Sequence, residues 1–242
     1  MVGPASHTSL DVARAVLVVD DEPQIRRAVA HALRGTADRV LEAVTGAEAI
    51  DLAAASRPEL VVLDLGLPDM AGLDVCLEIR RWATMPIIVL SARHAEDEKV
   101  RLLNAGADDY ITKPFSLLEF AARVQAQLRR SRTPPQPLGT VLETPDGLGI
   151  DFRQRTVTRL GTPIRLTPLE WEILRALAHE PGRTLTHQQI FDAAWGRQFG
   201  DVRQYLRVHI TNLRRKIELD SSRPRLIITE PGVGYRFELT PT

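Results

Sequence analysis

The chain has 242 residues, of which 44% are hydrophobic and 26% are charged, a mixture typical of globular proteins rather than disordered chains. No apolar run approaches the ~20 residues of a membrane span, and residues 1–14 lack the apolar centre of a signal peptide. The single cysteine, Cys76, excludes an intrachain disulfide and a cysteine-based zinc site. We therefore expect a cytoplasmic protein with no membrane partner and a flexible tail at 1–14.

The formal net charge of zero conceals two halves of opposite sign. Residues 1–130 carry 15 basic and 19 acidic side chains, whereas residues 131–242 carry 16 and 12. Between the halves, the segment 131–138 contains three prolines and no periodic apolar pattern, which is typical of a short, semi-stiff linker. We expect two domains, at 15–130 and 139–242, and the basic second domain is a candidate polyanion binder.

In the first half, short apolar runs alternate with amphipathic stretches. The expected strands are 15–19, 39–43, 60–63, 86–90 and 107–111, and the expected helices lie near 24–34, 46–55, 72–82, 96–105 and 116–130. Continuous β-branched runs suit strands that are buried on both faces. Five such units predict an α/β fold, a doubly wound, flavodoxin-like five-stranded parallel sheet whose chemistry lies at the carboxyl ends of the strands.

Polar side chains follow these strands. Asp20 and Asp21 come directly after the first strand and Asp64 after the third, so the three carboxylates are expected at one edge of the sheet. Such a cluster is costly unless a cation neutralises it, and oxygen-only ligands favour Mg²⁺. Ser91 ends the fourth strand and Lys113 follows the fifth, which suits a carboxylate that becomes phosphorylated. Taken singly, either early aspartate could instead cap the next helix, Ser91 could be a turn residue, and Lys113 a solvated charge.

Four segments of the first half resemble the receiver domains of two-component response regulators. They are VVDDEP (18–23), DLGLPDMAG (64–72), LSA (90–92) and GADDYITKPF (106–115). The resemblance implies that Asp64 accepts a phosphoryl group from a sensor histidine kinase. It also implies that Asp20 and Asp21 hold Mg²⁺ together with Asp64 and the backbone carbonyl of Gly66. The switch residues that it implies are Ser91, which senses the phosphoryl group, Lys113, which pairs with it, and Tyr110, the switch aromatic.

The same resemblance, to the OmpR/PhoB subfamily, implies a homodimer formed on phosphorylation. Its interface is the face of the fourth helix, fifth strand and fifth helix, and the implied ion pairs across the dimer are Lys99 with Glu119 and Asp109 with Arg123. A third family pair would place a base opposite Asp108, but Gln125 stands there. Ordinary solvated helix charges are the alternative, since surface pairs contribute only about 0–1 kcal/mol each.

The second half begins with strand-like pieces at 149–152, 156–160 and 163–166 and continues with helical patterns near 168–179, 186–195 and 202–219. Residues 225–239 alternate around Pro-Gly-Val-Gly, the pattern of a β-hairpin. Three helices followed by a hairpin predict an α+β winged helix-turn-helix domain. Thr167 and Thr186 precede the first two helices, where we expect them as N-caps.

The helix expected at 202–219 is amphipathic and is the best candidate for contact with nucleic acid. Its apolar stripe consists of Val202, Leu206, Ile210, Leu213 and Ile217. The opposite face suits the bases of a DNA major groove, and its members are Gln204, Arg207, Val208, Thr211, Asn212 and Arg215, with Arg214 at the margin. The hairpin offers Thr229, Tyr235 and Arg236 to the flanking backbone or minor groove. The alternative is a solvated basic helix face.

The second half resembles the winged-helix effector domains of the OmpR/PhoB subfamily. The segments that carry the resemblance are LTPLE (166–170), WG (195–196), VHI (208–210), LRRK (213–216) and GVGYRF (232–237). It implies promoter DNA as a partner and contact of the loop 196–201 with RNA polymerase. Pro231 stands where some relatives carry a wing arginine, so sequence readout by the wing is in doubt.

Within that subfamily, four shorter segments are similar to regulators of high-affinity potassium-transport operons: DLGLPD (64–69), VLSAR (89–93), YLR (205–207) and RPR with ITE (223–225, 228–230). We therefore predict a transcriptional regulator of such genes, switched by phosphorylation of Asp64, and not an enzyme. Two alternatives remain: a phosphorylation-independent regulator of other genes, and a phosphate-handling enzyme with a basic accessory domain. Gly66, where a second acid/base aspartate would stand, argues against the enzyme, as does the lack of a phosphate-cradling glycine loop.

Overall fold

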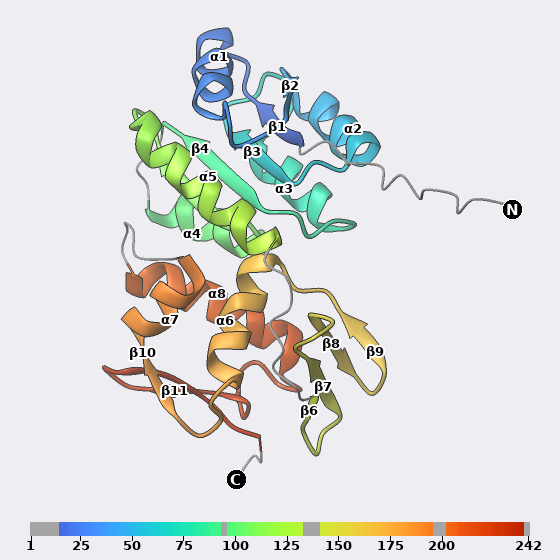
Figure 1. The fold of residues 1–242 in the computed structure, drawn as a ribbon, viewed down its shortest axis with the longest axis vertical. Coiled ribbons are helices and arrows are strands. Elements are labelled where there is room, and N and C mark those ends of the chain that lie inside the picture. Colours follow the sequence, from blue (N-terminus) through green and yellow to red (C-terminus); the bar gives the residue numbers. More distant parts are fainter. Residues whose placement is uncertain (1–14, 93–95, 133–140, 196–201, 240–242) are drawn as a thin grey trace, which may run out of the picture.

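The computed structural model describes residues 15–92, 96–132, 141–195 and 202–239, which form two domains (Figure 1). The expectations for the tail 1–14, for the linker from residue 133 and for the loop 196–201 lie outside the described residues. No described helix is both long enough and apolar enough to cross a membrane.

The N-terminal domain contains one parallel sheet of five strands in the order β2-β1-β3-β4-β5. The strands are β1 (Ala15–Val19), β2 (Arg39–Ala43), β3 (Leu60–Asp64), β4 (Ile87–Ser91) and β5 (Asp109–Thr112). The helices are α1 (Pro23–Ala32), α2 (Gly46–Ser56), α3 (Gly72–Arg80), α4 (Glu96–Asn104) and α5 (Leu117–Arg132). The predicted doubly wound α/β fold is confirmed.

The fifth strand begins two residues later than expected, because the preceding residues close α4. Gly106 has φ 100°, its N–H donates to Leu103, and the N–H of Ala107 donates to Leu102. This pair of bonds is a Schellman motif, which satisfies the last carbonyls of the helix. The apolar run in the sequence therefore includes a helix cap as well as a strand.

Both faces of the sheet are covered, because alternate residues of a strand point to opposite faces. Val16 and Val18 belong to one apolar cluster with Val29 of α1 and Phe120 of α5, whereas Leu17 belongs to the cluster that includes α2, α3 and α4. The second cluster continues without a break into the core of the C-terminal domain. The two domains therefore share buried apolar surface.

The C-terminal domain is the predicted winged helix. An antiparallel sheet, in the order β6-β7-β8-β9, contains β6 (Val141–Glu143), β7 (Leu148–Asp151), β8 (Thr156–Arg159) and β9 (Thr162–Ile164). It is followed by α6 (Pro168–Ala178), β10 (Thr184–Thr186), α7 (His187–Trp195), α8 (Val202–Ile217), β11 (Ile227–Glu230) and β12 (Gly234–Phe237). The expected strands did not include β6 and β10, which have three residues each and no alternation of buried and exposed side chains strong enough to identify them.

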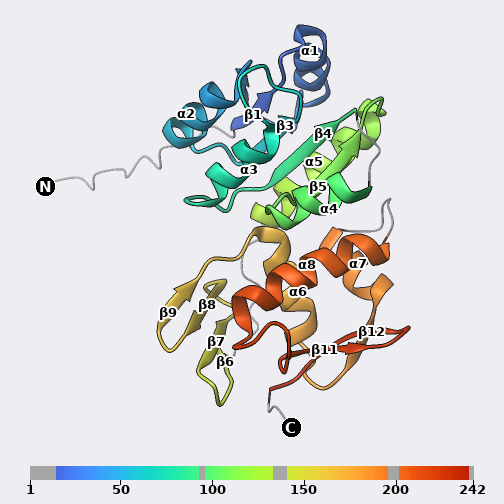
Figure 2. The same ribbon diagram turned by 180° about the vertical axis from the view of Figure 1, so that it is seen from behind.

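The predicted N-caps are confirmed. The Thr167 hydroxyl accepts from the N–H of Glu170 at 3.3 Å, and the Glu170 carboxylate accepts from the N–H of Thr167 at 2.8 Å, which is a capping box. Thr186 and Gln189 make the same reciprocal pair at the start of α7. The domains meet where α4 and α5 face α8 and α6, and Figure 2 shows α8 directly beside α4.

Candidate functional site

The carboxyl ends of the strands bring two carboxylates and one ammonium group together. The Lys113 ammonium lies 2.8 Å from Asp20 Oδ2 and 2.6 Å from Asp64 Oδ1. Asp20 is fully buried and Asp64 is 6% exposed. Because two buried carboxylates repel each other, the ammonium group between them offsets part of that repulsion.

The environment shifts the pKa of Asp20 and the pKa of Lys113. Burial raises the pKa of Asp20 above its ordinary value, although the hydrogen bonds from Lys113 and from the Glu22 N–H lower it. Burial by itself lowers the pKa of Lys113, but hydrogen bonds to Asp20 and Asp64 outweigh it and leave that pKa raised. The ammonium is therefore a permanent cation of the site at neutral pH.

Backbone amides hold the two carboxylates in place. Asp20 Oδ1 accepts from the N–H of Glu22 at 2.9 Å, and Asp64 Oδ2 accepts from the N–H of Gly66 at 2.6 Å. Glu22 is the N-cap residue of α1, so the alternative in which Asp20 or Asp21 caps this helix is wrong. Asp64 has its two oxygens fixed by one cation and one amide, which orients the carboxylate.

The site opens into a cavity of about 540 Å³. Its lining includes Asp21, Asp64, Ser91 and Lys113, together with Arg101 of α4. A cavity of this size beside a fixed carboxylate admits a phosphoryl donor and solvent.

The expected convergence of three carboxylates needs correction. Among the residues that the structure describes, no three Asp, Glu, His or Cys side chains lie close enough to hold one ion together. Asp21 is exposed, and the Lys113 ammonium occupies the place between Asp20 and Asp64. The donors still suit Mg²⁺ in kind, since they are carboxylate and carbonyl oxygens beside a cavity with room for the waters that this ion retains.

Ser91 and Tyr110 lie on adjacent strands and are both buried, at 1% and 4% exposure. Burial raises the pKa of Tyr110, and a hydrogen bond between its side chain and Ser91 acts in the opposite direction. The two side chains that the sequence analysis assigned to a switch are thus in contact.

The charges expected at a dimer interface are engaged within one chain. Arg123 binds both carboxylate oxygens of Asp109, at 3.0 and 3.1 Å, and Glu119 Oε1 at 2.8 Å. The Lys99 ammonium lies 4.0 Å from the ring centroid of Tyr205 in α8. Tyr205 therefore covers part of the face that was assigned to a second copy of the chain.

Asp108 also differs from the expectation of an exposed interface residue. It is 1% exposed, and its Oδ2 accepts from Arg80 at 2.8 Å and from the Ile87 N–H at 2.9 Å. The sequence analysis missed Arg80, because no motif distinguishes it from the other arginines at helix ends.

The apolar stripe of α8 is confirmed for its described side chains, Leu206, Ile210, Leu213 and Ile217, all at 1% exposure or less. The opposite face is divided. Arg207 and Arg215 are exposed and Gln204 and Thr211 are half-buried, whereas Val208 and Asn212 are each 7% exposed.

The burial of Val208 and Asn212 follows from contact between α8 and α4. Asn212 Nδ2 donates to the Leu103 carbonyl at 2.8 Å. On the same face of α8, the Tyr205 hydroxyl donates to the Tyr110 carbonyl at 3.0 Å. In this arrangement Val208 and Asn212 cannot reach a DNA groove. The prediction that they face DNA needs the domains to separate first.

The wing residues hold one another. Arg214 donates to the Ile227 carbonyl at 3.1 Å and to Thr229 Oγ1 at 2.8 Å, and its guanidinium lies 5.7 Å from the Tyr235 ring centroid. Arg236 pairs with Glu230 at 3.0 Å and also with Glu238. Arg214 thus joins α8 to β11, and this structural role corrects its assignment to DNA contact alone.

Comparison with known proteins agrees with this architecture. The family model "Response regulator receiver domain" matches residues 16–125, and "Transcriptional regulatory protein, C terminal" matches 161–237. The chain is 45% identical to the transcriptional regulatory protein KdpE of Mycobacterium tuberculosis (strain H37Rv), covering 92% of this chain and 98% of that protein. It is 42% identical to the KDP operon transcriptional regulatory protein KdpE of Escherichia coli (strain K12), covering 93% and 99%.

A solved structure of a RitR mutant has a TM-score of 0.77 at 25% identity and covers 93% of this chain and 99% of that one. The relatives are transcriptional regulators, so the prediction that the chain is not an enzyme is confirmed and the phosphate-handling enzyme is set aside. A receiver domain followed by a winged helix, with relatives of this identity over nearly the whole chain, places the protein among the two-component response regulators of the OmpR/PhoB family, as a DNA-binding transcriptional regulator similar to KdpE.

Proposed function

We propose that a sensor histidine kinase of the KdpD type phosphorylates Asp64, and that the phosphorylated protein dimerises and binds promoters of potassium-transport genes. The observation that carries the proposal is the buried Asp64 carboxylate, fixed by Lys113 and the Gly66 amide beside an open cavity. The likeness to KdpE proteins supports the choice of target genes.

In-line attack by Asp64 on a phosphoryl group needs positioning and charge neutralisation more than covalent assistance. Lys113 provides one positive charge at 2.6 Å from the attacking carboxylate. Asp20, Asp21, Asp64 and the carbonyl of Gly66 would hold Mg²⁺, which would supply further positive charge for the phosphoryl oxygens.

The added phosphoryl group carries about −1.5 to −2 charges and three acceptor oxygens. We infer that Ser91 turns to donate to one of them and gives up its hydrogen bond with Tyr110. The Tyr110 backbone carbonyl accepts from Tyr205, so a shift of the β5 backbone that accompanies the movement of the Tyr110 ring weakens the contact between α8 and the receiver domain. Separation of the domains then exposes Asn212 and Val208 to DNA and removes Tyr205 from Lys99, after which Asp109 and Arg123 exchange their pair within the chain for pairs with a second copy.

RNA polymerase is the remaining proposed partner, through the loop 196–201.

The exposed Arg207 and Arg215 support the proposed role of α8 in the major groove, since arginine recognises guanine in a bidentate manner.

The test is fluorescence anisotropy with duplex DNA from upstream of a potassium-transport operon, using protein treated with acetyl phosphate and Mg²⁺. Phosphorylation is expected to tighten binding by the wild type and by Asp51→Asn, an exposed-aspartate control, but not by Asp64→Asn. Equal affinity before and after treatment contradicts the proposal. Tight binding by untreated Asp64→Asn would support the phosphorylation-independent regulator instead. Equal affinity for an unrelated promoter would contradict the assignment of potassium-transport genes as the targets.

A further inference from the structure

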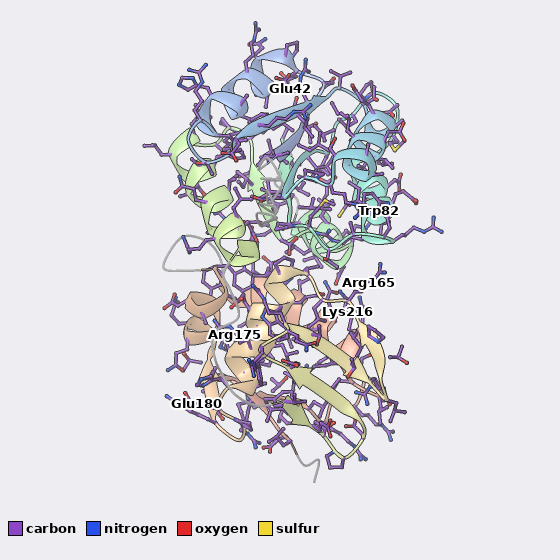
Figure 3. The ribbon with its side chains drawn as sticks, turned by 45° about the vertical axis from the view of Figure 1, so that its right-hand side comes forward. Glu42, Trp82, Arg165, Arg175, Glu180 and Lys216 are labelled. Atoms are coloured by element: carbon purple, nitrogen blue, oxygen red, sulfur yellow. The ribbon has the colours of Figure 1, made fainter. Side chains whose placement is uncertain are left out.

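A second cavity, of about 970 Å³, lies between the domains at the opposite ends of the strands from Asp64. The receiver domain contributes the segments 57–59 and 82–86, which precede β3 and β4, and the effector domain contributes parts of β8, β9 and the start of α6. Figure 3 shows Trp82 and Arg165 facing each other across the boundary. Nothing in the phosphorylation mechanism uses this cavity.

Three guanidinium groups line the cavity, from Arg57, Arg155 and Arg165, against one carboxylate, from Glu59. Arg57 and Arg165 are exposed and, within the described part of the chain, form no ion pair. Arg165 makes one long hydrogen bond, 3.4 Å to the Trp82 carbonyl, and Arg155 pairs with Glu172 at 2.9 Å. Two of the three cations therefore have most of their donors available to an anion.

Two of the three arginines lie in tight turns of the backbone. Arg57 has φ 44° and Arg155 has φ 55°, in the left-handed region that favours glycine or asparagine. Among the described residues other than glycine, only Leu160 shares a positive φ with them. Arg57 is the C-cap residue of α2, where its N–H donates to the Ala53 carbonyl, and Arg155 lies in the turn before β8, so both turns place an arginine at the cavity.

Two of the three tryptophans of the chain, Trp82 and Trp171, belong to the same lining. The Arg155 guanidinium lies 5.9 Å from the ring centroid of Trp171. Indole rings and guanidinium planes stack on flat ring systems, whereas unpaired guanidinium groups bind phosphate. Trp171 is buried against Phe152, so the half-buried Trp82 is the ring of this lining that a ligand can reach, beside the exposed Arg57 and Arg165.

We propose that this cavity binds a small anion that carries a planar ring, the chemistry of a nucleoside phosphate. Its volume lies within the usual range of small-molecule sites. Because both domains contribute side chains, such a ligand binds best to the packed arrangement and stabilises it. The binding itself depends neither on phosphorylation of Asp64 nor on DNA.

The proposal is tested by titrating the full chain with ADP or GDP, without Mg²⁺, and following tryptophan fluorescence. A saturable change below about 1 mM is expected. The double variant Arg57→Gln with Arg165→Gln, which lacks both cations, is expected to bind the nucleotide at least tenfold more weakly. The control is Arg27→Gln, at an exposed position of α1, and its affinity is expected to equal that of the wild type. Circular dichroism checks the fold, and Arg165→Lys, which keeps the charge, is expected to lose less affinity than Arg165→Gln.

Pyrophosphate and adenosine, titrated separately, are each expected to bind more weakly than ADP, since each offers half of the contacts. The proposal is overturned if neither nucleotide gives a saturable change, or if the double arginine variant binds as the wild type does. Equal affinity for pyrophosphate and ADP overturns the assignment of a planar ring.

Discussion

Lys113 supplies the positive charge that lies between the two buried carboxylates of the site. Its ammonium contacts Asp20 and Asp64, which are nearly inaccessible to solvent. Without it, two buried carboxylates would face each other with no cation from the protein, and the phosphoryl group would meet uncompensated negative charge.

Replacing Lys113 by alanine is expected to slow phosphorylation of Asp64 by acetyl phosphate about 10- to 100-fold, because a charge-assisted hydrogen bond contributes about 1.5–3 kcal/mol. The rate is measured by intact-mass spectrometry against time. The control is Arg81→Ala, whose side chain is 76% exposed. A rate equal to that of the wild type would show that Lys113 does not stabilise the transferring group.

Asp69 connects the motif after β3 to the start of α2. Its two carboxylate oxygens accept from the N–H groups of Gly46 and Ala47, at 2.8 and 2.9 Å. These hydrogen bonds lower the pKa of Asp69 below 3.8, its ordinary value. The contact therefore stabilises the folded state above that value and is lost as the pH falls through the lower, folded pKa.

The Asp69→Asn variant is expected to be less stable than the wild type at neutral pH, and the difference is expected to shrink on acidification below about pH 4. Urea unfolding at several pH values measures it, with Asp51→Asn as the exposed control. A difference that is independent of pH would mean that the ionised carboxylate is not what binds the amides.

At the scale of the element, α8 has three faces with different roles. One packs into its own domain, one packs on α4, and one exposes Arg207 and Arg215. Arg214 acts with the face that packs into its own domain, because its guanidinium donates to Ile227 and Thr229 of β11. Neighbouring arginines of one helix should therefore respond differently to substitution.

Arg207→Ala is expected to weaken promoter binding by about 1–3 kcal/mol with no loss of stability, as for a base-reading side chain. Arg214→Ala is expected to lower the free energy of unfolding by about 1 kcal/mol, because it removes the hydrogen bonds from α8 to the Ile227 carbonyl and to Thr229. Anisotropy measures the first and urea unfolding the second. If Arg207→Ala lowers the free energy of unfolding as much as Arg214→Ala does, the two arginines do not have the separate roles assigned to them.

At the scale of the whole molecule, the surface assigned to DNA and the surface assigned to dimerisation cover each other. Tyr205 donates to Tyr110, Asn212 donates to Leu103, and Lys99 lies over the Tyr205 ring. Each contact contributes about a kilocalorie per mole, so a single phosphoryl group can shift the balance between packed and separated domains.

The Tyr205→Phe variant removes one hydroxyl donor from the domain boundary and keeps the ring beside Lys99. The unphosphorylated variant is expected to bind promoter DNA about two- to tenfold more tightly than the unphosphorylated wild type, while the phosphorylated forms bind alike. Anisotropy provides the affinities, and sedimentation velocity shows whether the variant is more extended. Unchanged affinity and shape would mean that this bond does not hold the domains together.

The architecture of each domain was predictable, because the apolar runs of β1, β3 and β4 and the stripe of α8 reflect burial that any fold of this kind requires. The approach of Asp20, Asp64 and Lys113 was also predictable from their positions at strand ends. The contact between domains was not, because Tyr205 and Asn212 donate to backbone carbonyls of the other domain, and neither a periodic pattern nor a strand-end position identifies such partners. The strand-end positions predicted that Asp20, Asp64 and Lys113 lie close together. They did not predict that the Lys113 ammonium lies between the two carboxylates, where a metal was expected.

The central claim, that Asp64 is the phosphoryl acceptor, is tested most directly by mass spectrometry of the intact chain after incubation with acetyl phosphate and Mg²⁺. We predict that the wild type gains the mass of one phosphoryl group, located at Asp64 by peptide mapping, and that Asp64→Asn gains none. A wild type that gains no mass, or an Asp64→Asn variant that gains as much, would contradict the claim.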